Sequence, residues 1–520
     1  MKKIYLSLHL LILIIIGVSA IFYFKFTAED AYITYRYAEN WVNLGSLVYN
    51  EGEPINAMTS PLHAVLSAAL FFVTGNTVLS NKILSFVLLG LATLLVWHRY
   101  KEHLHLQVLA FLLLIPPSVL LWTFGGLETP ILLFLATLTV ILALRPPPFR
   151  LKLLWAIFFL SGLGFLTRYD SILFFLPITL YAASKSQSIK NVVIALTGAA
   201  ILPLAWLFVS YFYYGDLLPT SFYVKTPNGN IGSLIFNGIY VAFYLLYVGI
   251  IPVIVLVLVI LVPKHRTIDV LYRHFKSIWW LYMGISLEIL YGLTMATHHM
   301  MFSFRFFVPY IPSTVIILVD LVSRASESTE VDLSIGIPAY LFTTFLLSLT
   351  LFQLYQNVYT YQHSINGLSP IGEYRAIGIH DYMRFMQILR QEAFDIENHW
   401  VLTNGDSGRR PRIITYAAGM LPYTYRGSYI YEKLVSYRHC HERYRQGLYA
   451  DYIHILAPRQ GQIDQQLPNS VDSYYLVSSY EMMFDGSMQK FLVYYNPKPE
   501  AHNLSVGIND FCKQAVKVVN

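Results

Sequence analysis

The sequence predicts a mostly α-helical polytopic membrane protein with about eleven transmembrane helices (residues 1–357) and a C-terminal soluble α/β domain (358–520). Of its 520 residues, 56% are hydrophobic and only 13% are charged, whereas soluble globular proteins carry about 25% charged residues. The apolar residues form repeated stretches close to the roughly 20 residues that a helix needs to cross a bilayer. After residue 357 shorter, more polar segments replace them, which indicates a separate domain.

Eleven apolar windows predict the spans. The first resembles a secretory signal, with Val18 and Ala20 at a plausible cleavage site. Because its apolar run continues to Phe24, we interpret it as an uncleaved first helix. The windows lie near residues 4–24, 80–97, 107–123, 130–145, 152–167, 170–184, 190–212, 240–262, 277–296, 306–323 and 335–355.

The basic residues of the short loops predict the orientation of the spans, since Lys and Arg mark cytoplasmic loops. With Lys2 and Lys3 inside, the loops HRYKEH, RPPPFRLK, KSQSIK, PKHRTIDVLYRHFK and SRASES all fall on the cytoplasmic side. This alternation of loops requires that segment 61–75 does not cross the membrane. Because the segment is short for a span, we interpret it as an interfacial helix in the first external loop (25–79). The C-terminal domain then faces the non-cytoplasmic side.

Polar residues of the opposite loops predict a functional site on that side. These loops read EDAYITYRYAEN, GGLETP, TRYD, GDLLPTSFYVKT and HHMMFSFRF. Placing ionisable groups near membrane depth costs free energy, so their concentration on one side of the membrane favours a functional role for them. The sequence contains neither G-x-x-x-x-G-K-[ST] nor G-x-G-x-x-G and gives no sign of nucleotide binding. An outward-facing enzyme would need an activated substrate delivered in the membrane.

Glu29 and Asp30 follow the first span directly. If the next residues are helical, Asp30, Thr34, Tyr37 and Trp41 share one helix face. A carboxylate there is suited to act as a general base towards a hydroxyl within hydrogen-bond reach. The alternative is that Asp30 caps the helix N-terminus.

Three basic residues are candidates for binding a phosphate, which Arg does through its planar fork and Lys as a point charge. Lys225 and Arg305 lie among aromatic residues at the expected outer membrane edge, where a lipid phosphate would lie. The alternative for both is snorkelling at a helix end. Arg36 is the third candidate, and its alternative is pairing with Glu39 or Asn40 on its own helix.

Other ionisable residues stand at span boundaries. Glu128 is suited either to a structural ion pair or to binding substrate hydroxyls, and for Arg168 with Asp170 we favour the structural pair. His298 and His299 are adjacent and would point in different directions on a helix, so we expect no joint metal site. A divalent cation held against a phosphate by the Glu29–Asp30 pair is a weaker alternative.

The stretch EDAYITYRYAENWVNLGSLVYNEGEPINAMTSPLHAVL resembles the first-loop signature of the arabinofuranosyltransferase-like branch of the C-type (GT-C) glycosyltransferases. These polytopic enzymes take sugars from polyprenyl-phosphate carriers outside the cytoplasm. GGLETP, TRYD, GDLLPTSFYVKT and FRFFVPYIP resemble further family elements in the same order, so the resemblance covers most of residues 1–325. Two departures are Glu29, where the family usually has Asp, and INAMTSPL, where relatives often have a Gly and an aromatic residue.

The resemblance implies a bacterial inner-membrane enzyme of cell-envelope polysaccharide biosynthesis. It would transfer a sugar, with arabinofuranose as one candidate, from a polyprenyl-phosphate donor to a glycan or glycoprotein, without a cofactor or a nucleic-acid partner. Asp30 or Glu29 would accept the proton of the attacking hydroxyl in a single inverting displacement, and Lys225, Arg305 and then Arg36 would bind the donor phosphate. The expected substrate contacts are Tyr37, Thr59, Ser60, His63, Glu128, Asp170, Asp216, His298 and His299.

Two other functions stay open from the sequence. One is a flippase or transporter of lipid-linked sugars, and the other is a polysaccharide polymerase or ligase that uses a longer lipid-linked glycan. Transporters often show internal repeats and broken helices near the membrane midplane. We find no repeat, and the charged residues fall at one membrane edge, so a transferase is favoured.

The polar tail predicts one helix and several short strands. GEYRAIGIHDYMRFMQILRQEA has helical spacing, whereas WVLTNGDSGRRPRIITYAAG, DYIHILAP, DSYYLVSSY and KFLVYYN read as strands with turns. Asp406 in NGDSG is suited to contact sugar, although a turn-stabilising role is favoured. Cys440 and Cys512 could form a disulfide in an oxidising compartment, and HCH around Cys440 is a weak metal motif.

Overall fold

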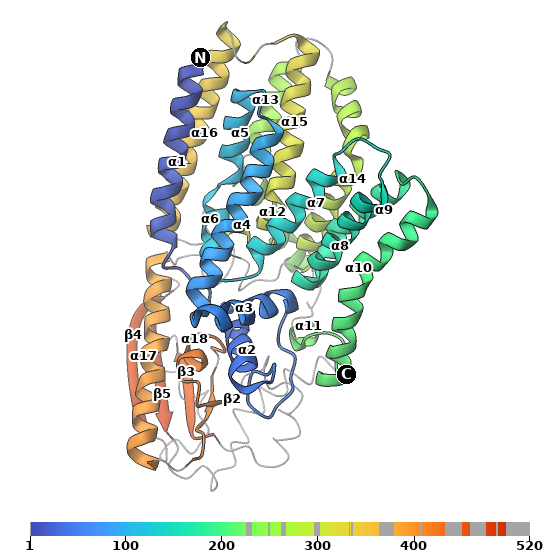
Figure 1. The fold of residues 1–520 in the computed structure, drawn as a ribbon. Coiled ribbons are helices and arrows are strands. Elements are labelled where there is room, and N and C mark those ends of the chain that lie inside the picture. Colours follow the sequence, from blue (N-terminus) through green and yellow to red (C-terminus); the bar gives the residue numbers. More distant parts are fainter. Residues whose placement is uncertain are drawn as a thin grey trace. The chain divides into compact units, whose positions relative to one another are not determined.

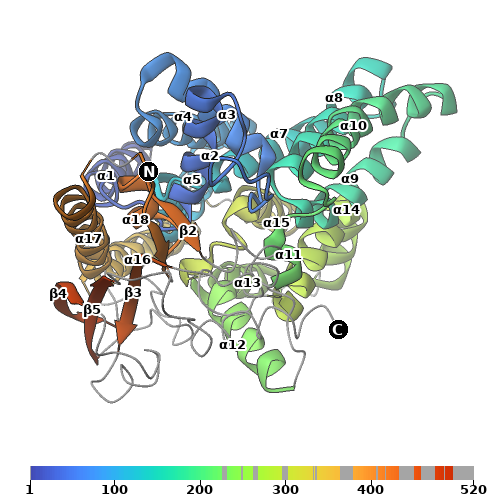
Figure 2. The same cartoon turned by 90° about the horizontal axis from the view of Figure 1, so that it is seen from below.

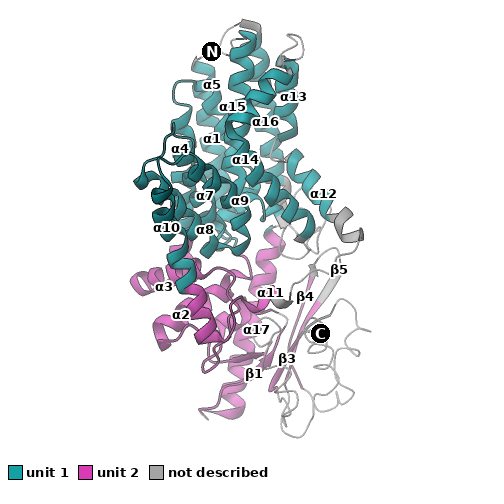
Figure 3. Ribbon diagram, turned by 90° about the vertical axis from the view of Figure 1, so that its right-hand side faces the viewer, with its two compact units in different colours: residues 1–26, 82–205, 228–379 teal, residues 27–81, 206–227, 380–520 magenta. Residues whose placement is uncertain are grey.

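The protein divides into two compact units, and each gathers separate stretches of the chain (Figure 3). In the computed structural model, unit 1 holds residues 1–26, 82–205 and 228–379, and unit 2 holds 27–81, 206–227 and 380–520. Our sequence division at residue 357 placed the first loop with the spans, whereas these units group it with the tail. The structure describes residues 2–224, 231–247, 250–261, 267–295, 302–331, 333, 336–362, 379–405, 408–415, 417–431, 450–457, 475–484 and 487–495.

Unit 1 is built from helices (Figure 1). The structure confirms the helical class. Among the described residues, five single helices are long and apolar enough to cross a membrane. The number rises to seven if each of two bent helix pairs counts as one span. The helices are α1 (Lys2–Tyr23), α4 (Thr77–Arg99), α5 (Leu104–Leu114), α6 (Pro117–Phe124), α7 (Thr129–Ala143), α8 (Leu151–Thr167), α9 (Ile172–Ser184), α10 (Ile189–Val209), α12 (Ile231–Tyr247), α13 (Ile250–Leu261), α14 (Thr267–Met295), α15 (Ile311–Thr329) and α16 (Gly336–Gln362).

Several predicted spans differ from straight membrane-crossing helices. The window near 107–123 is a pair, α5 and α6, bent by 56°, because Pro116 and Pro117 lack the N–H groups that a continuing helix needs. The window near 240–262 is a second bent pair, α12 and α13. The windows near 130–145, 152–167 and 170–184 form shorter apolar helices of 15, 17 and 13 residues.

Helix α15 is the most enclosed candidate span. Its apolar window is 83% buried, against 17% to 33% for the four other single-helix candidates. It packs against α5, α7, α13 and α14 (Figure 2). Because α15 follows the FSFRFFVPY segment directly, this packing fixes the position of Arg305.

Unit 2 contains helices, most of them short, and a mixed sheet. Its helices are α2 (Ala31–Leu44), α3 (Pro61–Thr74), α11 (Thr220–Val224), α17 (Ile379–Asn404) and α18 (Met420–Thr424). The strands are β1 (Arg412–Ile414), β2 (Tyr429–Tyr431), β3 (Tyr452–Ala457), β4 (Tyr475–Phe484) and β5 (Ser487–Tyr495), in the order β2-β1-β3-β5-β4. Strand β1 is parallel to both neighbours, whereas β5 is antiparallel to both of its own.

The mixed α/β class of the tail is confirmed, with one correction. Residues 400–404, which we expected to begin a strand, are the last turn of α17. The helix continues because its buried positions Leu389, Ala393, Ile396 and Trp400 keep helical spacing. Segment 61–75 forms a helix of 14 residues, α3.

The core of unit 2 explains why the first loop groups with the tail. Tyr37 on α2 and Tyr49 in the loop pack in one buried cluster with Trp400 on α17 and Ile413 and Tyr452 on the sheet. Burying such large side chains contributes about 1.5–3 kcal/mol each. The first loop and the C-terminal domain therefore share a hydrophobic core.

Candidate active site

Glu29 is held by the backbone of the tail. Its carboxylate accepts hydrogen bonds from the N–H groups of Gly419 and Met420, the second at 3.3 Å. Its own N–H donates to the hydroxyl of Tyr382 at 2.8 Å. A Cβ on Gly419 would lie 2.0 Å from the Glu29 carbonyl oxygen, so only glycine fits there. Glu29 thus fixes the entry to α2.

Asp30 occupies the N-cap position of α2, yet its side chain makes no capping hydrogen bond to the helix. The residue is half-buried. On the face that we expected Asp30 to share, Tyr37 is buried, whereas Trp41 is 39% exposed. The Tyr37 hydroxyl donates to the Ile55 carbonyl at 2.5 Å and accepts from the Ala57 N–H at 3.0 Å. Tyr37 therefore holds the loop that follows α2.

Arg36 is buried and binds carbonyl oxygens instead of a carboxylate. Its Nε donates to Tyr49 at 3.0 Å, Nη2 to Ser428 at 2.8 Å, and Nη1 to Pro422. Burial lowers the pKa of Arg36. The guanidinium thus forms these bonds and not the pairing with Glu39 or Asn40 that we considered. These three bonds tie α2 to the loop after it and to the tail.

Glu39 is a second buried charge of α2, which we considered only as a partner for Arg36. Its Oε1 accepts from the hydroxyls of Thr77 at 2.5 Å and Tyr423 at 2.6 Å. Its Oε2 forms an ion pair with Arg426. Burial, together with the Glu39 carboxylate, raises the pKa of Tyr423. Glu39 thus joins α2 to Thr77, which belongs to unit 2, and to α18.

The expected substrate contacts of unit 2 differ in accessibility. His63 is buried, and its Nε2 lies 3.2 Å from Oδ1 of Asn81. Ser60 is also buried, whereas Thr59 beside it is exposed. Asp216 is half-buried, and its carbonyl accepts from the Ser210 hydroxyl at 2.7 Å. Thr59 is the most accessible of these four side chains.

In unit 1, Arg168 joins two carboxylates that are distant in the sequence. Its Nη1 lies 3.1 Å from Oε1 of Glu128, and its Nη2 lies 2.9 Å from Oδ2 of Asp170. Nη2 of Arg305 lies 3.3 Å from the same Glu128 oxygen. Glu128, Arg168, Asp170 and Arg305 form what we call the ion cluster. Its two positive and two negative charges balance, as buried charges require.

Arg305 emerges from a strained stretch of backbone. Ser303 and Phe304 have φ angles of 50° and 56°, which are uncommon for residues other than glycine. The Arg305 guanidinium lies 5.3 Å from the ring of Trp122, a cation–π distance. Strained backbone of this kind is concentrated at functional sites, which favours a role for Arg305 beyond its ion pair.

Sequence reasoning missed two ionisable residues of unit 1. Lys82 on α4 is buried, and its Nζ donates to the carbonyls of Phe24 and Phe26, the second at 2.8 Å. Glu288 on α14 is buried near Asp170. The available signal was a single charge within each apolar stretch, SNKILSFVLL and GISLEILYG.

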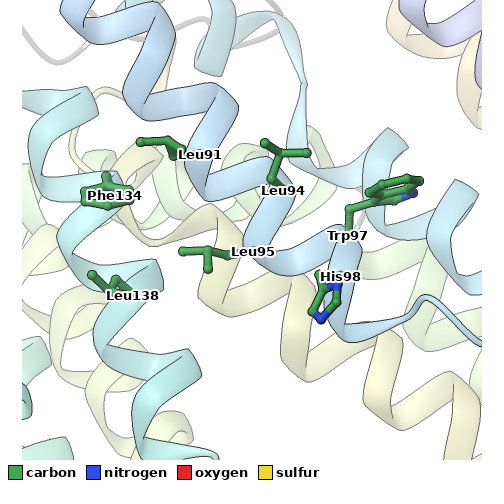
Figure 4. Close-up of a pocket in the computed structure, with 7 residues that line it drawn as sticks. All are labelled: Leu91, Leu94, Leu95, Trp97, His98, Phe134 and Leu138. Carbon is green, nitrogen blue, oxygen red and sulfur yellow. The ribbon is translucent and has the colours of Figure 1, made fainter.

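A cavity of about 460 Å³ lies between α4 and α7 (Figure 4). Its lining carries neither a carboxylate nor a Lys or Arg side chain, so we assign it no part in the chemistry. The lining residues are Leu91, Leu94, Leu95, Trp97, His98, Phe134 and Leu138.

Some expected residues lie outside the described part of the chain: Lys225, His298, His299, Asp406, Cys440 and Cys512. Within the described ranges, no group of three or more His, Cys, Asp or Glu side chains could hold a metal ion.

The apolar helical unit and the α/β unit define a polytopic membrane protein with a GT-C-like fold. The chain is similar in structure to ArnT from Cupriavidus metallidurans bound to undecaprenyl phosphate, with a TM-score of 0.54, 11% identity and coverage of 94% of this chain and 97% of ArnT. For apo ArnT the TM-score is 0.55 at 11% identity, with coverage of 92% and 97%. No family model and no curated protein matches the sequence. The likeness confirms the predicted fold.

Proposed function

We propose that this protein is a membrane glycosyltransferase that takes its sugar from a polyprenyl-phosphate carrier. The observation that carries the proposal is the likeness to ArnT, which spans nearly all of both chains and includes a structure with undecaprenyl phosphate bound. A shared fold alone does not fix a reaction, so the residues must supply the rest. The polar residues of the first loop and the charged span boundaries provide groups suited to sugar transfer.

Asp30 is our candidate for the general base. Of the two adjacent acids, Glu29 already accepts two backbone hydrogen bonds from the tail. Asp30 at the N-cap of α2 is the more exposed of the two, half-buried where Glu29 is buried. In the proposed reaction Asp30 takes the proton of an acceptor hydroxyl. The hydroxyl oxygen bonds to the anomeric carbon as the bond to the polyprenyl phosphate breaks, and this single displacement inverts the centre.

Lys82 and Arg305 are our candidates for binding the phosphate that departs. The Lys82 ammonium has three N–H donors, and carbonyl oxygens occupy two of them. The third donor is suited to a phosphate oxygen. Arg305 and Arg168 both contact Glu128. A phosphate would therefore compete with the Glu128 carboxylate for the Arg305 guanidinium. Lys225 stays a further candidate from the sequence.

We further propose that transfer occurs on the non-cytoplasmic side, with the N-terminus in the cytoplasm, as the basic loops predict. The donor sugar would be a lipid-linked pentose or hexose, with arabinofuranose suggested by the first-loop resemblance. A glycan or glycoprotein would be the acceptor. The ArnT-like fold favours transfer over the flippase alternative, which predicts movement of the lipid sugar without transfer.

The test is transfer by purified full-length protein in nanodiscs, supplied with polyprenyl-phosphate sugars and glycan acceptors. We expect Asp30→Asn to lower the rate about 100-fold or more, since general-base catalysis contributes roughly 10²–10⁴-fold. Glu29→Gln should retain more activity than Asp30→Asn. Full transfer by Asp30→Asn would overturn the assignment of the base. Vesicles that translocate the lipid sugar without transferring it would favour the flippase.

A further inference from the structure

The parallel strands β1 and β2 present one of their faces away from the core of unit 2. Ile413 and Ile430 are 0% exposed in the hydrophobic cluster of that core. Because successive side chains of a strand point to opposite faces, Arg412 on β1 and Tyr429 and Tyr431 on β2 lie on the other face. Arg412 is paired in register with Tyr429, and all three side chains are half-buried. We call these three residues the outer face.

The Arg412 guanidinium is held on one side only. Oδ2 of Asp451, a buried carboxylate, accepts from the Arg412 backbone N–H at 2.8 Å and lies 3.4 Å from Nε. Within the part of the chain that the structure describes, the two Nη groups of Arg412 donate no hydrogen bond. A guanidinium fork matches the two oxygens of a carboxylate or a phosphate. Asp451 therefore orients Arg412 and leaves its fork available to an anion.

Positive charge is in excess around Arg412. Asp451 also pairs with Arg409, whose Nη2 lies 2.8 Å from Oδ1. Arg410 forms an ion pair with Glu51. Among the described residues, these three arginines therefore pair with two carboxylates, and the side chains of Arg409 and Arg410 are 44% and 50% exposed. An excess of accessible guanidinium groups attracts anions.

The two tyrosine rings of the outer face favour a sugar as the carrier of that anion. Their centroids lie 5.0 Å apart, with the ring planes tilted by 58°. Burial raises the pKa of Tyr431, and the nearby charge of Arg412 opposes this rise. A tyrosine ring offers an apolar face to the C–H groups of a sugar. Membrane binding, by contrast, uses exposed apolar side chains that insert into lipid, and both rings are half-buried.

We propose that the outer face binds an anionic sugar residue of a glycan. The carboxylate or phosphate of that sugar lies on the fork of Arg412, and its ring packs on Tyr431. Arg409 and Arg410 attract the glycan without contacting the anion. The binding stands without the proposed function, whereas the role of this glycan as the acceptor of the transferred sugar rests on it.

The test is isothermal titration calorimetry of the full-length protein in phosphatidylcholine nanodiscs, whose lipids carry no net charge. The probes are a tetramer of galacturonic acid, a neutral tetramer of galactose and the same galactose tetramer with one phosphate. We expect at least one acidic tetramer to bind about tenfold or more tightly than the neutral one, since hydrogen bonds to charged groups are the stronger kind. The difference should shrink as salt is raised. The tighter of the two acidic tetramers identifies the anion.

Variants of Arg412 test the fork. Arg412→Gln should weaken binding of the acidic tetramer about tenfold or more and leave binding of the neutral tetramer unchanged. Arg412→Lys keeps the charge but loses the fork, so its affinity should fall between those of wild type and Arg412→Gln. Arg384→Gln is the matched control, because it removes the same charge from the exposed side of α17, whose buried side chains pack on the core face. Its binding should equal that of wild type.

Variants of Tyr431 test the ring and do not depend on how Arg412→Gln folds. Tyr431→Phe should bind nearly like wild type, whereas Tyr431→Leu should bind all tetramers about threefold to tenfold more weakly, as expected for a lost ring contact. Equal binding of acidic and neutral tetramers, or wild-type binding by both Arg412→Lys and Tyr431→Leu, would overturn the proposal. Binding of phosphatidylglycerol vesicles in place of either acidic tetramer would overturn it as well.

The transfer assay tests the proposed function separately. Binding that responds to these variants in a protein that transfers no sugar keeps the outer face as a glycan site and rejects the proposed function. Transfer without binding of an acidic tetramer does the reverse.

Discussion

Two buried sites, one in each unit, satisfy their charged residues by opposite means. In the ion cluster of unit 1, carboxylates and guanidinium groups neutralise one another: Glu128 lies within 3.3 Å of both Arg168 and Arg305. In unit 2, Arg36 is satisfied by three carbonyl oxygens and Glu29 by two backbone N–H groups. The ion cluster therefore depends on its own side chains, whereas Arg36 and Glu29 depend on the backbone of a distant segment.

Breaking the ion cluster should have the largest effect. Glu128→Gln leaves the buried Arg305 and the half-buried Arg168 without this carboxylate, and removing one partner of a buried ion pair costs about 3–5 kcal/mol. The measurement is unfolding of the purified protein in detergent by heat or denaturant. Asp170→Asn is the matched control, because Arg168 then keeps Glu128. Equal stabilities of the two variants would mean that Glu128 does not organise the cluster.

Displacing the backbone partner of Glu29 should have the second-largest effect on stability. In Gly419→Ala the new Cβ would lie 2.0 Å from the Glu29 carbonyl oxygen. Overpacking of this kind costs about 1–3 kcal/mol, so we expect a loss of about 3 kcal/mol. Gly90→Ala, where a Cβ meets nothing within 4 Å, should leave unfolding nearly unchanged. The same unfolding experiment checks both, and a tolerated alanine at 419 would contradict this contact.

Removing one neutral partner of a buried charge should have a smaller effect. Tyr423→Phe deletes the hydroxyl that donates to Glu39 at 2.6 Å, and a hydrogen bond to a charged group contributes about 1.5–3 kcal/mol. Thr77 and Arg426 stay as partners of Glu39, so we expect the lower end, about 1.5 kcal/mol. Stability equal to wild type would show that these partners suffice.

The smallest expected effect is the titration of His399. Burial lowers the pKa of this imidazole, and its Nδ1 lies 2.9 Å from the Tyr452 hydroxyl. A lowered folded-state pKa means that the unfolded chain binds the proton more readily, so stability falls as the pH drops below about 6.5, the unfolded value. His399→Gln should reduce this slope in unfolding measured from pH 7.5 to 5. An unchanged slope would place its origin in other groups.

The sequence predicted best what depends on residue type. Apolar stretches predicted the helices, and the charged pair TRYD predicted the Arg168–Asp170 ion pair, which the structure contains. Backbone partners are invisible in a sequence, because every residue carries the same N–H and C=O groups. The contacts of Arg36 and Glu29 with the backbone of residues 419–428 therefore could not be predicted.

Helix length and grouping were harder to predict than helix type. Hydropathy does not report bends, so α5 and α6 read as one span although Pro116 and Pro117 were visible between them. Lys82 was overlooked because one charged residue barely changes the mean hydropathy of an apolar window. The first loop was assigned to the membrane domain because sequence neighbours suggested it, whereas the core around Tyr49 and Ile413 joins distant segments.

The carbonyl partners of Arg36 are synthesised long after Arg36 itself. Pro422 and Ser428 lie 386 and 392 residues further along the chain. At about 5–20 residues per second, a ribosome needs roughly 20 to 80 seconds to supply them after Arg36 has been made. Throughout that interval the nascent first loop must keep its arginine hydrated or bound elsewhere, so unit 2 matures only near the end of translation.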